Sequence, residues 1–380
     1  MHLGGLVMAL TKYRIGDLIS VVDERNDIGI REFYGININK EFMPTVANTE
    51  GLDETKYKVV RKNRFVYSGM QTGRDECIRI SMYTKDSPIL VSPAYTTFEV
   101  TSLDTVIPLY FFMKFLTKER DRYGAFCSDG SIRSNLDWDV FCDIEIELPS
   151  LEVQQKYVNV YNAMLANQQS YERGLEDLKL VCDAYIEDLR RKMPCEAIGP
   201  YIAPCDERNS DLRVTKAQGI TINKVFADPK QVAEAERSAK IVRNGQFAYN
   251  RATTRNGEKI SIAYRDKEDC VVSSAYQVFE IKEKKKLIPE YLMMWFKRSE
   301  FDRYARYMSK GSAHEFFEYT DMEEVAIPIP DIEVQICIAN IFNCYMERKE
   351  INEKLKAQIK NICPILIKGS IEEALKTKEA

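Results

Sequence analysis

The sequence has 380 residues, 45% of them hydrophobic and 29% charged, with a formal net charge of −4. Such a chain is large enough for two hydrophobic cores, and none of its apolar runs approaches the roughly 18 to 20 residues of a membrane span. Its 10 cysteines include no Cys-x-x-Cys pair, which argues against zinc ribbons and disulfide scaffolds and favours reduced cysteines in the cytoplasm.

Residues 1–11 are expected to form a leader ahead of the first domain. They are mildly apolar but lack a basic segment, which disfavours a secretory signal peptide. A loosely ordered leader and a start codon at Met8 both remain open.

Residues 12–149 are expected to form a first α/β domain. A helix is predicted over 109–123, because Pro108 suits the first turn of a helix. Short apolar and aromatic runs predict strands at 64–67, 78–83 and 89–91.

Residues 150–194 are expected to form a long helical connector. Ser150 can cap its first turn, and Glu152 is placed favourably against the helix dipole. Along the helix, residues at alternating spacings of four and three form the heptad seam of a coiled coil. The seam residues are Tyr157, Tyr161, Met164, Gln168, Tyr171, Leu175, Leu178, Cys182, Tyr185 and Leu189.

Residues 195–330 are expected to form a second domain similar to the first. Residues 92–154 align with 273–335 at a constant offset of 181, and 22 of these 63 positions are identical. A match of this length indicates a duplicated unit. The strands predicted here lie at 247–249, 260–264 and 271–272, and the helix at 291–304.

Residues 331–380 are expected to form a second helical connector, which Pro364 ends or kinks near Cys363. We expect the two connectors to pack as an intramolecular antiparallel coiled coil, with Gln168 and Asn352 helping to set its register. For the first two turns of each helix, packing against its own domain is the alternative. The second seam consists of Ile341, Tyr345, Arg348, Asn352, Leu355, Ile359, Ile362 and Leu366.

The sequence offers little material for catalysis. Its only histidines are His2 and His314, and it has no Gly-rich phosphate loop. The run from Ser92 to Tyr95 looks like an amino-methyltransferase motif, but it lacks that motif's second proline. We therefore expect no catalytic, metal or cofactor site in this chain.

Two basic segments instead favour binding to nucleic acid. Residues 58–85 and 240–265 each carry a net charge of +5, at equivalent places in the two copies. The loops around them offer forked donors that suit base edges and phosphates, although ordinary hairpin turns are the alternative. The predicted DNA-binding residues are Arg61, Arg64, Ser68, Gln71, Thr72, Arg74, Tyr95, Ser131, Arg133, Arg243, Asn250, Arg251, Thr253, Thr254, Arg255, Asn256, Lys259, Tyr276, Lys310, Ser312 and His314.

The sequence resembles one family, the specificity subunits of Type I restriction-modification enzymes. That family has a Pro-x-x-Glu-x-Gln-like element after each target recognition domain. Here the element follows a Gly-Ser loop and opens each long helix, from Pro149 to Gln154 and again from Pro330 to Gln335. The copies differ in that Glu147 stands where the second has Pro328.

The resemblance implies two α/β target recognition domains, related by a pseudo-two-fold internal repeat and separated by the helices. It implies a non-catalytic chain that directs two methylation subunits and two restriction subunits to a bipartite double-stranded DNA site. Adenine methylation with S-adenosylmethionine, and ATP- and Mg-dependent cleavage, would belong to those partners. The alternatives are the DNA-specificity part of a related methylation or phage-defence system, or a coiled-coil scaffold that binds no DNA.

Overall fold

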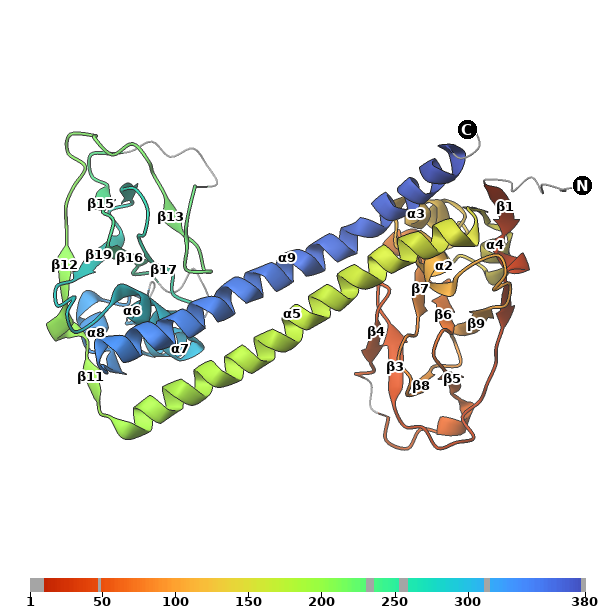
Figure 1. Ribbon diagram of the computed structural model, residues 1–380, viewed down its shortest axis with the longest axis horizontal. Coiled ribbons are helices and arrows are strands. Elements are labelled where there is room, and N and C mark those ends of the chain that lie inside the picture. The colour runs from red at the N-terminus through yellow and green to blue at the C-terminus, as the bar shows by residue number, and fades with distance from the viewer. Residues whose placement is uncertain (1–9, 47–48, 230–235, 253–258, 311–314, 377–380) are drawn as a thin grey trace, which may run out of the picture. The chain divides into compact units, whose positions relative to one another are not determined.

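The computed structural model describes residues 10–46, 49–229, 236–252, 259–310 and 315–376. The chain divides into two compact units, each holding one domain and a part of both long helices (Figure 1). Unit 1 comprises residues 1–170 and 352–380, and unit 2 comprises residues 171–351. Among the described helices, none is long and apolar enough to cross a membrane. All ten cysteines have free thiols.

Unit 1 contains two four-stranded sheets and a separate strand pair. The first sheet has the order β4 (Phe42–Pro44), β3 (Phe33–Ile36), β8 (Ile89–Val91), β5 (Lys58–Val60). The second has the order β2 (Ile19–Val21), β9 (Thr96–Val100), β6 (Phe65–Ser68), β7 (Arg79–Met82). The pair joins β1 (Thr11–Arg14) to β10 (Glu145–Leu148). The helices are α1 (Thr72–Asp75), α2 (Pro108–Phe115), α3 (Lys118–Phe126) and α4 (Trp138–Asp143).

Strand β6 separates the two apolar layers of unit 1. Phe65 and Tyr67 face the cluster that contains α2, whereas Val66 faces the cluster between the two sheets. Alternate side chains of a strand point to opposite faces, so a short run of large apolar residues can serve both layers. The predicted strands at 64–67, 78–83 and 89–91 are therefore confirmed as β6, β7 and β8, within two residues at each end.

Unit 2 repeats this arrangement, except that the counterpart of the first sheet is divided into two strand pairs. Its four-stranded sheet has the order β12 (Ile202–Cys205), β19 (Tyr276–Ile281), β16 (Gln246–Asn250), β17 (Ile262–Tyr264). The other strands are β11 (Cys195–Ala197), β13 (Gly219–Ile220), β14 (Phe226–Ala227), β15 (Lys240–Val242), β18 (Cys270–Val272) and β20 (Ala326–Pro328). The helices are α6 (Pro289–Phe296), α7 (Ser299–Met308) and α8 (Tyr319–Glu323).

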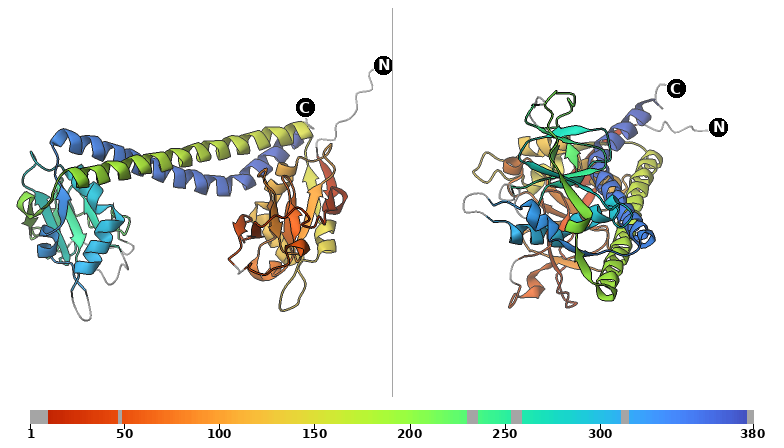
Figure 2. Two further views of the ribbon diagram at one scale, coloured as in Figure 1. Left: turned by 90° about the horizontal axis from the view of Figure 1, so that it is seen from below. Right: turned by 90° about the vertical axis from the view of Figure 1, so that its left-hand side faces the viewer.

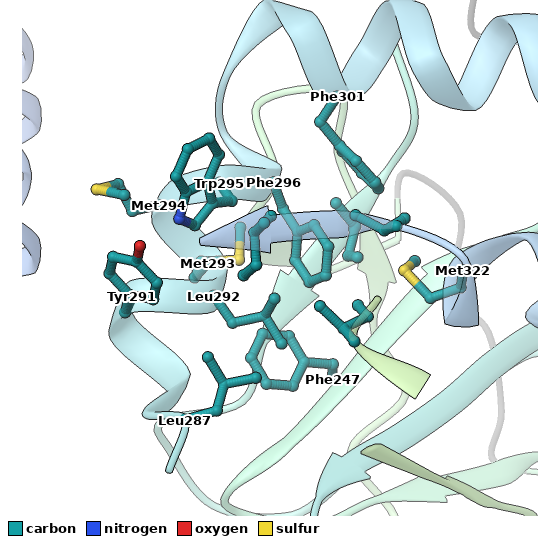
Figure 3. Packing of buried hydrophobic residues seen from close by; sticks show 14 of the residues in the cluster. Phe247, Leu287, Tyr291, Leu292, Met293, Met294, Trp295, Phe296, Phe301 and Met322 are labelled. Carbon is teal, nitrogen blue, oxygen red and sulfur yellow. The ribbon is translucent and has the colours of Figure 1, made fainter. Parts of the chain in front are cut away.

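One aromatic pair demonstrates the duplication in three dimensions. Phe65 stacks on Phe98 with ring centroids 5.0 Å apart, and Phe247 stacks on Phe279 at 5.0 Å. Both pairs join neighbouring strands of the same sheet, and in unit 2 Phe296 of α6 packs on the stack (Figure 3). The internal repeat inferred from the sequence is thus a repeat of the core.

Each of the two predicted mid-domain helices is in fact two helices, so that prediction was wrong in both copies. In the first, Thr117 is extended and its hydroxyl accepts a hydrogen bond from the backbone N of Arg120, which caps α3. In the second, Arg298 is extended between α6 and α7. The break has a physical reason, because it turns Asp121 and Asp302 back toward the buried lysines described below.

The two long helices are α5 (Leu151–Lys192) and α9 (Ile332–Lys376). The first matches the predicted connector, residues 150–194, to within two residues at each end. The second runs through Pro364, so of the two predicted effects of this proline, an end or a kink, the end was wrong. Pro364 is exposed, which leaves room for its ring on the solvent side of the helix.

Within unit 1 the helices lie side by side along one side of the domain and run in opposite directions (Figure 2). Lys156 near the start of α5 pairs with Glu373 near the end of α9 at 2.7 Å. Further along α5, Gln168 meets Asn352. Within unit 2, the Arg348 guanidinium lies 5.5 Å from the ring centroid of Tyr171. These contacts confirm the antiparallel pairing of the connectors.

One seam residue is misplaced. Tyr185 is 44% exposed, and its neighbour Ile186 is buried in the core of unit 2 with Cys182. An α-helix drifts from a strict seven-residue repeat, so the buried stripe moves by one position where α5 packs on the domain. The alternative of packing against the helix's own domain concerned the first two turns of each helix, and there Ile338 of α9 does join the core of unit 2.

Candidate nucleic-acid interface

The residues that the two copies share build the fold. Gln154 is fully buried, and its Nε2 donates to the carbonyl oxygens of Thr105 and Pro149 at 2.9 and 2.8 Å. Its Oε1 accepts from the backbone N of Ile107 at 3.0 Å. The amide is therefore fully used in clamping the start of α5 to the segment before α2.

Gln335 makes the same three contacts in unit 2. Its Nε2 donates to the carbonyl oxygens of Lys286 and Pro330 at 2.6 and 2.7 Å, and its Oε1 accepts from Ile288 N at 3.1 Å. The glutamine of the repeated Pro-x-x-Glu-x-Gln-like element thus has a structural role. It joins each long helix rigidly to its own domain.

The Asp-Arg-Tyr repeat is also structural. Lys40 Nζ lies 2.7 Å from Asp121, and Lys224 Nζ lies 2.7 Å from Asp302. All four side chains are largely buried, and burial lowers the pKa of Lys224. Removing one member of a buried ion pair leaves an uncompensated buried charge and strongly destabilises the fold. These pairs therefore explain why the aspartates recur.

Two loops that are distant in sequence meet beyond the end of β6. The first follows β6 and includes α1, and the second spans residues 127–137. Leu136 N donates to the carbonyl oxygen of Gly69 at 2.8 Å, and Gly73 N donates to that of Ser134 at 3.0 Å. A Cβ on Gly69 would lie 1.9 Å from the oxygen of Leu136, so only glycine permits this approach. The structure therefore brings residues 71–74 and 131–133 to one edge, which we call reading edge 1. The predicted residues on it are Gln71, Thr72, Arg74, Ser131 and Arg133.

Asp129 organises the second loop of reading edge 1. Its Oδ1 accepts from Ser131 Oγ at 2.7 Å and from the backbone N of Asn135 at 2.9 Å. The Ser131 hydroxyl, followed by these backbone donors, lowers the pKa of the Asp129 carboxyl. This turn presents Arg133 and the fully exposed Ile132 at its tip.

The two arginines of reading edge 1 are available for a ligand. Arg74 and Arg133 are exposed, and neither has a hydrogen-bond or ion-pair partner among the described residues. Ser68 and Thr72 are buried, and the Thr72 hydroxyl donates to Gly69 O at 3.1 Å. These two predicted contacts are thus corrected: their side chains support the loop from beneath.

Unit 2 has the equivalent edge after β16, reading edge 2, with different side chains. Phe317 N donates to Arg251 O at 2.9 Å, as Leu136 does to Gly69. The Arg251 guanidinium pairs with Glu318 at 3.0 Å and lies 5.9 Å from the ring centroid of Phe316.

The remaining predicted residues of reading edge 2 are placed as follows. The Asn250 side chain accepts from Ala252 N at 3.1 Å. Lys259 is exposed, and Lys310 lies 3.6 Å from Asp321. Outside the described residues lie Thr253, Thr254, Arg255, Asn256, Ser312 and His314.

Three predicted arginines lie at the opposite end of the strands. Arg61 and Arg64 precede β6 and both bind Glu24, with Arg61 Nη2 at 2.6 Å. Arg243 precedes β16 and binds Glu207 and Asp269. Hydrogen bonds from the arginines lower the pKa of both glutamates. Since these charges are already neutralised and a strand's length away from the reading edges, we remove them from the candidate interface.

Tyr95 and Tyr276 face inward. The Tyr276 hydroxyl lies beside Gly219 and accepts from Ile220 N at 3.4 Å, and the Tyr95 hydroxyl lies beside Gly35, the counterpart of Gly219. Their recurrence is therefore explained by packing between the sheets. Sequence reasoning missed Ile132 and Asn135, although an isoleucine between serine and arginine in a polar loop was a usable signal.

Among the described residues, no group of three or more His, Cys, Asp or Glu side chains is placed to hold a metal ion. The candidate site is therefore built from hydrogen-bond donors and two free cations on reading edge 1, and from partly neutralised cations on reading edge 2. Such donors recognise phosphates and base edges.

The chain resembles known proteins both in part of its sequence and in its fold. Residues 230–361 match the family model of the Type I restriction modification DNA specificity domain. No curated protein sequence matches significantly. The crystal structure of a Type-I restriction-modification system S subunit from M. genitalium matches with a TM-score of 0.62, 13% identity and 98% of each chain covered.

Two further structures match with lower scores. The HsdS subunit from Thermoanaerobacter tengcongensis gives a TM-score of 0.43 at 13% identity, over 96% of each chain. A structure of the type I R-M system gives 0.44 at 13% identity, over 94% of this chain and 97% of that one. Residues 230–361 are therefore similar to the Type I restriction modification DNA specificity domain, and the chain as a whole has the fold of the M. genitalium S subunit.

Proposed function

We propose that this chain is the DNA-recognition specificity subunit of a Type I restriction-modification complex, and that each domain reads one half of a bipartite duplex site. One observation carries the proposal. The two copies keep the same buried clamps and aromatic stacks but place unlike side chains on the same edge of the same sheet. Gly69 of one reading edge corresponds to Arg251 of the other.

In this pattern the shared residues build the fold, and the residues that differ between the copies would determine sequence specificity. If both domains performed one chemical step, the exposed loops would be as similar as the core. Instead reading edge 1 offers two free arginines and an exposed isoleucine, whereas reading edge 2 offers a paired arginine beside an aromatic ring. Side chains that differ in donor geometry suit different bases. The proposal therefore assigns a different half-site to each domain.

The chain would act without chemistry of its own. Methylation subunits that bind S-adenosylmethionine, and restriction subunits that use ATP and Mg, would supply the reactions as partners. We propose two copies of each, docked with the help of the long helices, which also set the spacer between the half-sites. The glutamine clamps support this role, because they fix the direction in which each helix leaves its domain.

The test is to map methylated adenines after combining the purified chain with its methylation subunit. The expected result is methylation of one bipartite sequence. The control is the chain alone with S-adenosylmethionine, which should transfer no methyl group. A gel shift decides between this function and a scaffold that binds no DNA: the complex should bind duplex containing the mapped site, and equal affinity for every duplex would refute the proposal.

A further inference from the structure

A second site lies in unit 2, away from the reading edge. A cavity of about 390 Å³ opens beside the turn between β17 and β18 and is lined by the β13–β14 hairpin and α6. Its volume falls in the range of small-molecule pockets, about 300–1,000 Å³. Phe226 and Tyr264 form aromatic parts of its wall, and Met293 and Met294 of α6 form apolar parts.

The lining is cationic. Five lysines and arginines line the cavity, against two acidic residues. One cation, Lys224, is occupied by Asp302. Another, Lys297, is half-buried and has no side-chain hydrogen-bond or ion-pair partner among the described residues; burial lowers its pKa. Lys216 and Lys267 are exposed, so Lys297 and Arg265 are the two lining cations whose burial is costly unless an anion compensates it.

Arg265 is the most unusual residue of the cavity. It is only 2% exposed, and its guanidinium lies 5.1 Å from the ring centroid of Phe226. Nη1 donates to Gln218 at 2.7 Å and Nε to the carbonyl oxygen of Glu268, but Nη2 has no hydrogen-bond partner in the described part of the chain. Buried donors are almost always satisfied, so an orphaned arginine N–H beside a cavity points to a missing acceptor.

The first domain shows that the fold does not require these cations. The backbone N of Arg265 donates to Gln246 O, and Tyr83 N makes the equivalent bond to Arg64 O, so Tyr83 occupies the same position. Tyr83 packs on Phe42 at 5.2 Å, just as Arg265 packs on Phe226. Its hydroxyl is satisfied by the Ser87 carbonyl at 2.6 Å.

Lys297 has a similar counterpart. The constant offset of 181 residues places Leu116 at the position of Lys297. The duplication thus provides a natural comparison, in which unit 1 fills both positions with uncharged side chains. The charges in unit 2 are additions to the common fold.

We propose that this cavity binds a small phosphate-bearing anion, held by the Arg265 guanidinium and Lys297 Nζ against the aromatic wall. Phosphate has the several acceptor oxygens that an arginine and a lysine together can satisfy. Tyr264 ends β17 and pairs with Phe247 near the start of β16, whereas reading edge 2 follows the end of β16. The cavity is therefore separated from the reading edge by the length of the strand, which favours a free phosphate compound over a backbone phosphate of the DNA being read.

The test uses the full chain and isothermal titration calorimetry with inorganic phosphate, pyrophosphate and ATP. The variants are Arg265→Tyr and Lys297→Leu, which introduce the residues that unit 1 carries at these positions. Arg265→Lys, which keeps the charge but removes the forked donors, guards against misfolding. The control is Arg122→Gln, which removes one exposed charge from unit 1. Thermal unfolding checks that each variant folds.

Binding of at least one probe, weakened about tenfold or more by Arg265→Tyr and by Lys297→Leu but unchanged by Arg122→Gln, supports the proposal; about tenfold is 1.4 kcal/mol. A parallel titration with short non-specific duplex distinguishes the source of the phosphate. Duplex affinity that falls in the variants, with no binding of the three probes, would assign the cavity to DNA backbone and overturn the free ligand. No binding of any probe together with unchanged duplex affinity, or equal binding by all variants, overturns the site itself.

Discussion

Gln168 of α5 and Asn352 of α9 are joined by a buried hydrogen bond, in which Gln168 Nε2 donates to Asn352 Oδ1 at 3.0 Å. The two side chains are 8% and 3% exposed, in a seam that is otherwise largely apolar. Apolar seams tolerate several registers, whereas a buried amide pair is satisfied in only one. The pair therefore defines how α5 and α9 align within unit 1.

Replacing one member of this pair should cost more than replacing both. In Gln168→Leu the Asn352 amide stays buried without its partner, which should lower the free energy of unfolding by about 1–3 kcal/mol. In the double variant with Asn352→Leu no buried amide remains, and stability should return to the wild-type value or exceed it. Urea unfolding followed by circular dichroism measures both.

The exposed neighbour Gln169 provides the control, since Gln169→Leu should change little. If the single and double variants were equally destabilised, the hydrogen bond would not be the interaction that matters. Register is tested separately by a disulfide between Cys substitutions at facing seam positions, which should form more slowly in the double variant.

Arg74, one of the two free arginines of reading edge 1, should contribute directly to DNA affinity. Arg74→Gln removes an exposed, unpaired cation and should weaken binding of one half-site by about 1–3 kcal/mol at fixed salt. The matched control is Arg61→Gln, because Arg61 is equally cationic but paired with Glu24 at the other end of β6. Fluorescence anisotropy with the methylation partner measures both. Equal losses for the two variants would show that total charge, and not position on the reading edge, governs affinity.

The signature glutamines should matter for folding and not for recognition. Gln335→Leu leaves two carbonyl oxygens and one backbone N–H without partners in a buried place, so we expect a loss of about 3 kcal/mol or more in unfolding free energy. Gln155→Leu, at an exposed position of α5, is the control. Variant protein that remains folded should methylate the same sequence. A changed sequence in a fully stable variant would contradict the clamp.

The sequence predicted the features that rest on periodicity. The duplication, the strands around Phe65 and Phe247, the antiparallel seam and the Gln168–Asn352 contact all follow from repeated spacing. The prediction that Tyr185 lies in the seam was wrong, because the heptad repeat applies only where a helix packs on another helix. Here Ile186 faces a globular core instead. The spacing of apolar residues shows that one side of a helix is buried. It does not show whether another helix or a globular domain covers that side.

The candidate site was predicted less well, because a sequence shows where a charged residue lies but not whether it has an ion-pair partner in the folded chain. Arg61 and Arg243 look as suitable for DNA as Arg74, but each has a glutamate partner about 36 residues away that only folding brings near. The division of the predicted helix into α2 and α3 at Thr117 was missed for a similar reason, because it depends on a contact between distant residues. Asp121 must reach buried Lys40, and this contact spans 81 residues.

Lys114 should give unit 1 a pH-dependent stability in the alkaline range. Its side chain is buried, with Nζ donating to the Glu147 carbonyl oxygen at 2.6 Å, and burial lowers its pKa from 10.5 to about 8. Between these values the unfolded chain binds a proton that the folded chain does not. The free energy of unfolding should therefore rise with pH across this window, by at most about 1.4 kcal/mol for each pH unit.

Urea unfolding of the wild type and of Lys114→Met between pH 7 and pH 10.5 measures this contribution. The variant should gain stability relative to the wild type at the lower end, and the difference should shrink as pH rises. Lys118→Met, at an exposed position, is the control. Parallel curves for wild type and Lys114→Met would mean that Lys114 keeps its proton in the folded chain.

The last prediction concerns the spacer between the half-sites. Helix α5 has 42 residues, which at ~1.5 Å each amounts to roughly 63 Å of rod. Removing residues 171–177 and 343–349 deletes seven positions from both helices and keeps the pairing of Gln168 with Asn352. Seven residues shorten a helix by about 10 Å, which corresponds to about three base pairs of duplex.

If the helices act as a ruler, methylome mapping of this deletion should reveal the same two half-sequences with a shorter unread spacer. Replacing residues 12–149 by the domain of another family member is the complementary change, because it should alter one half-sequence and leave the spacer as it was. The clamps at Gln154 and Gln335 make this separation possible, since each domain is fixed to a helix and not to the other domain's loops. A deletion that left the spacer unchanged, or a domain exchange that altered both halves, would show that the spacing is set elsewhere.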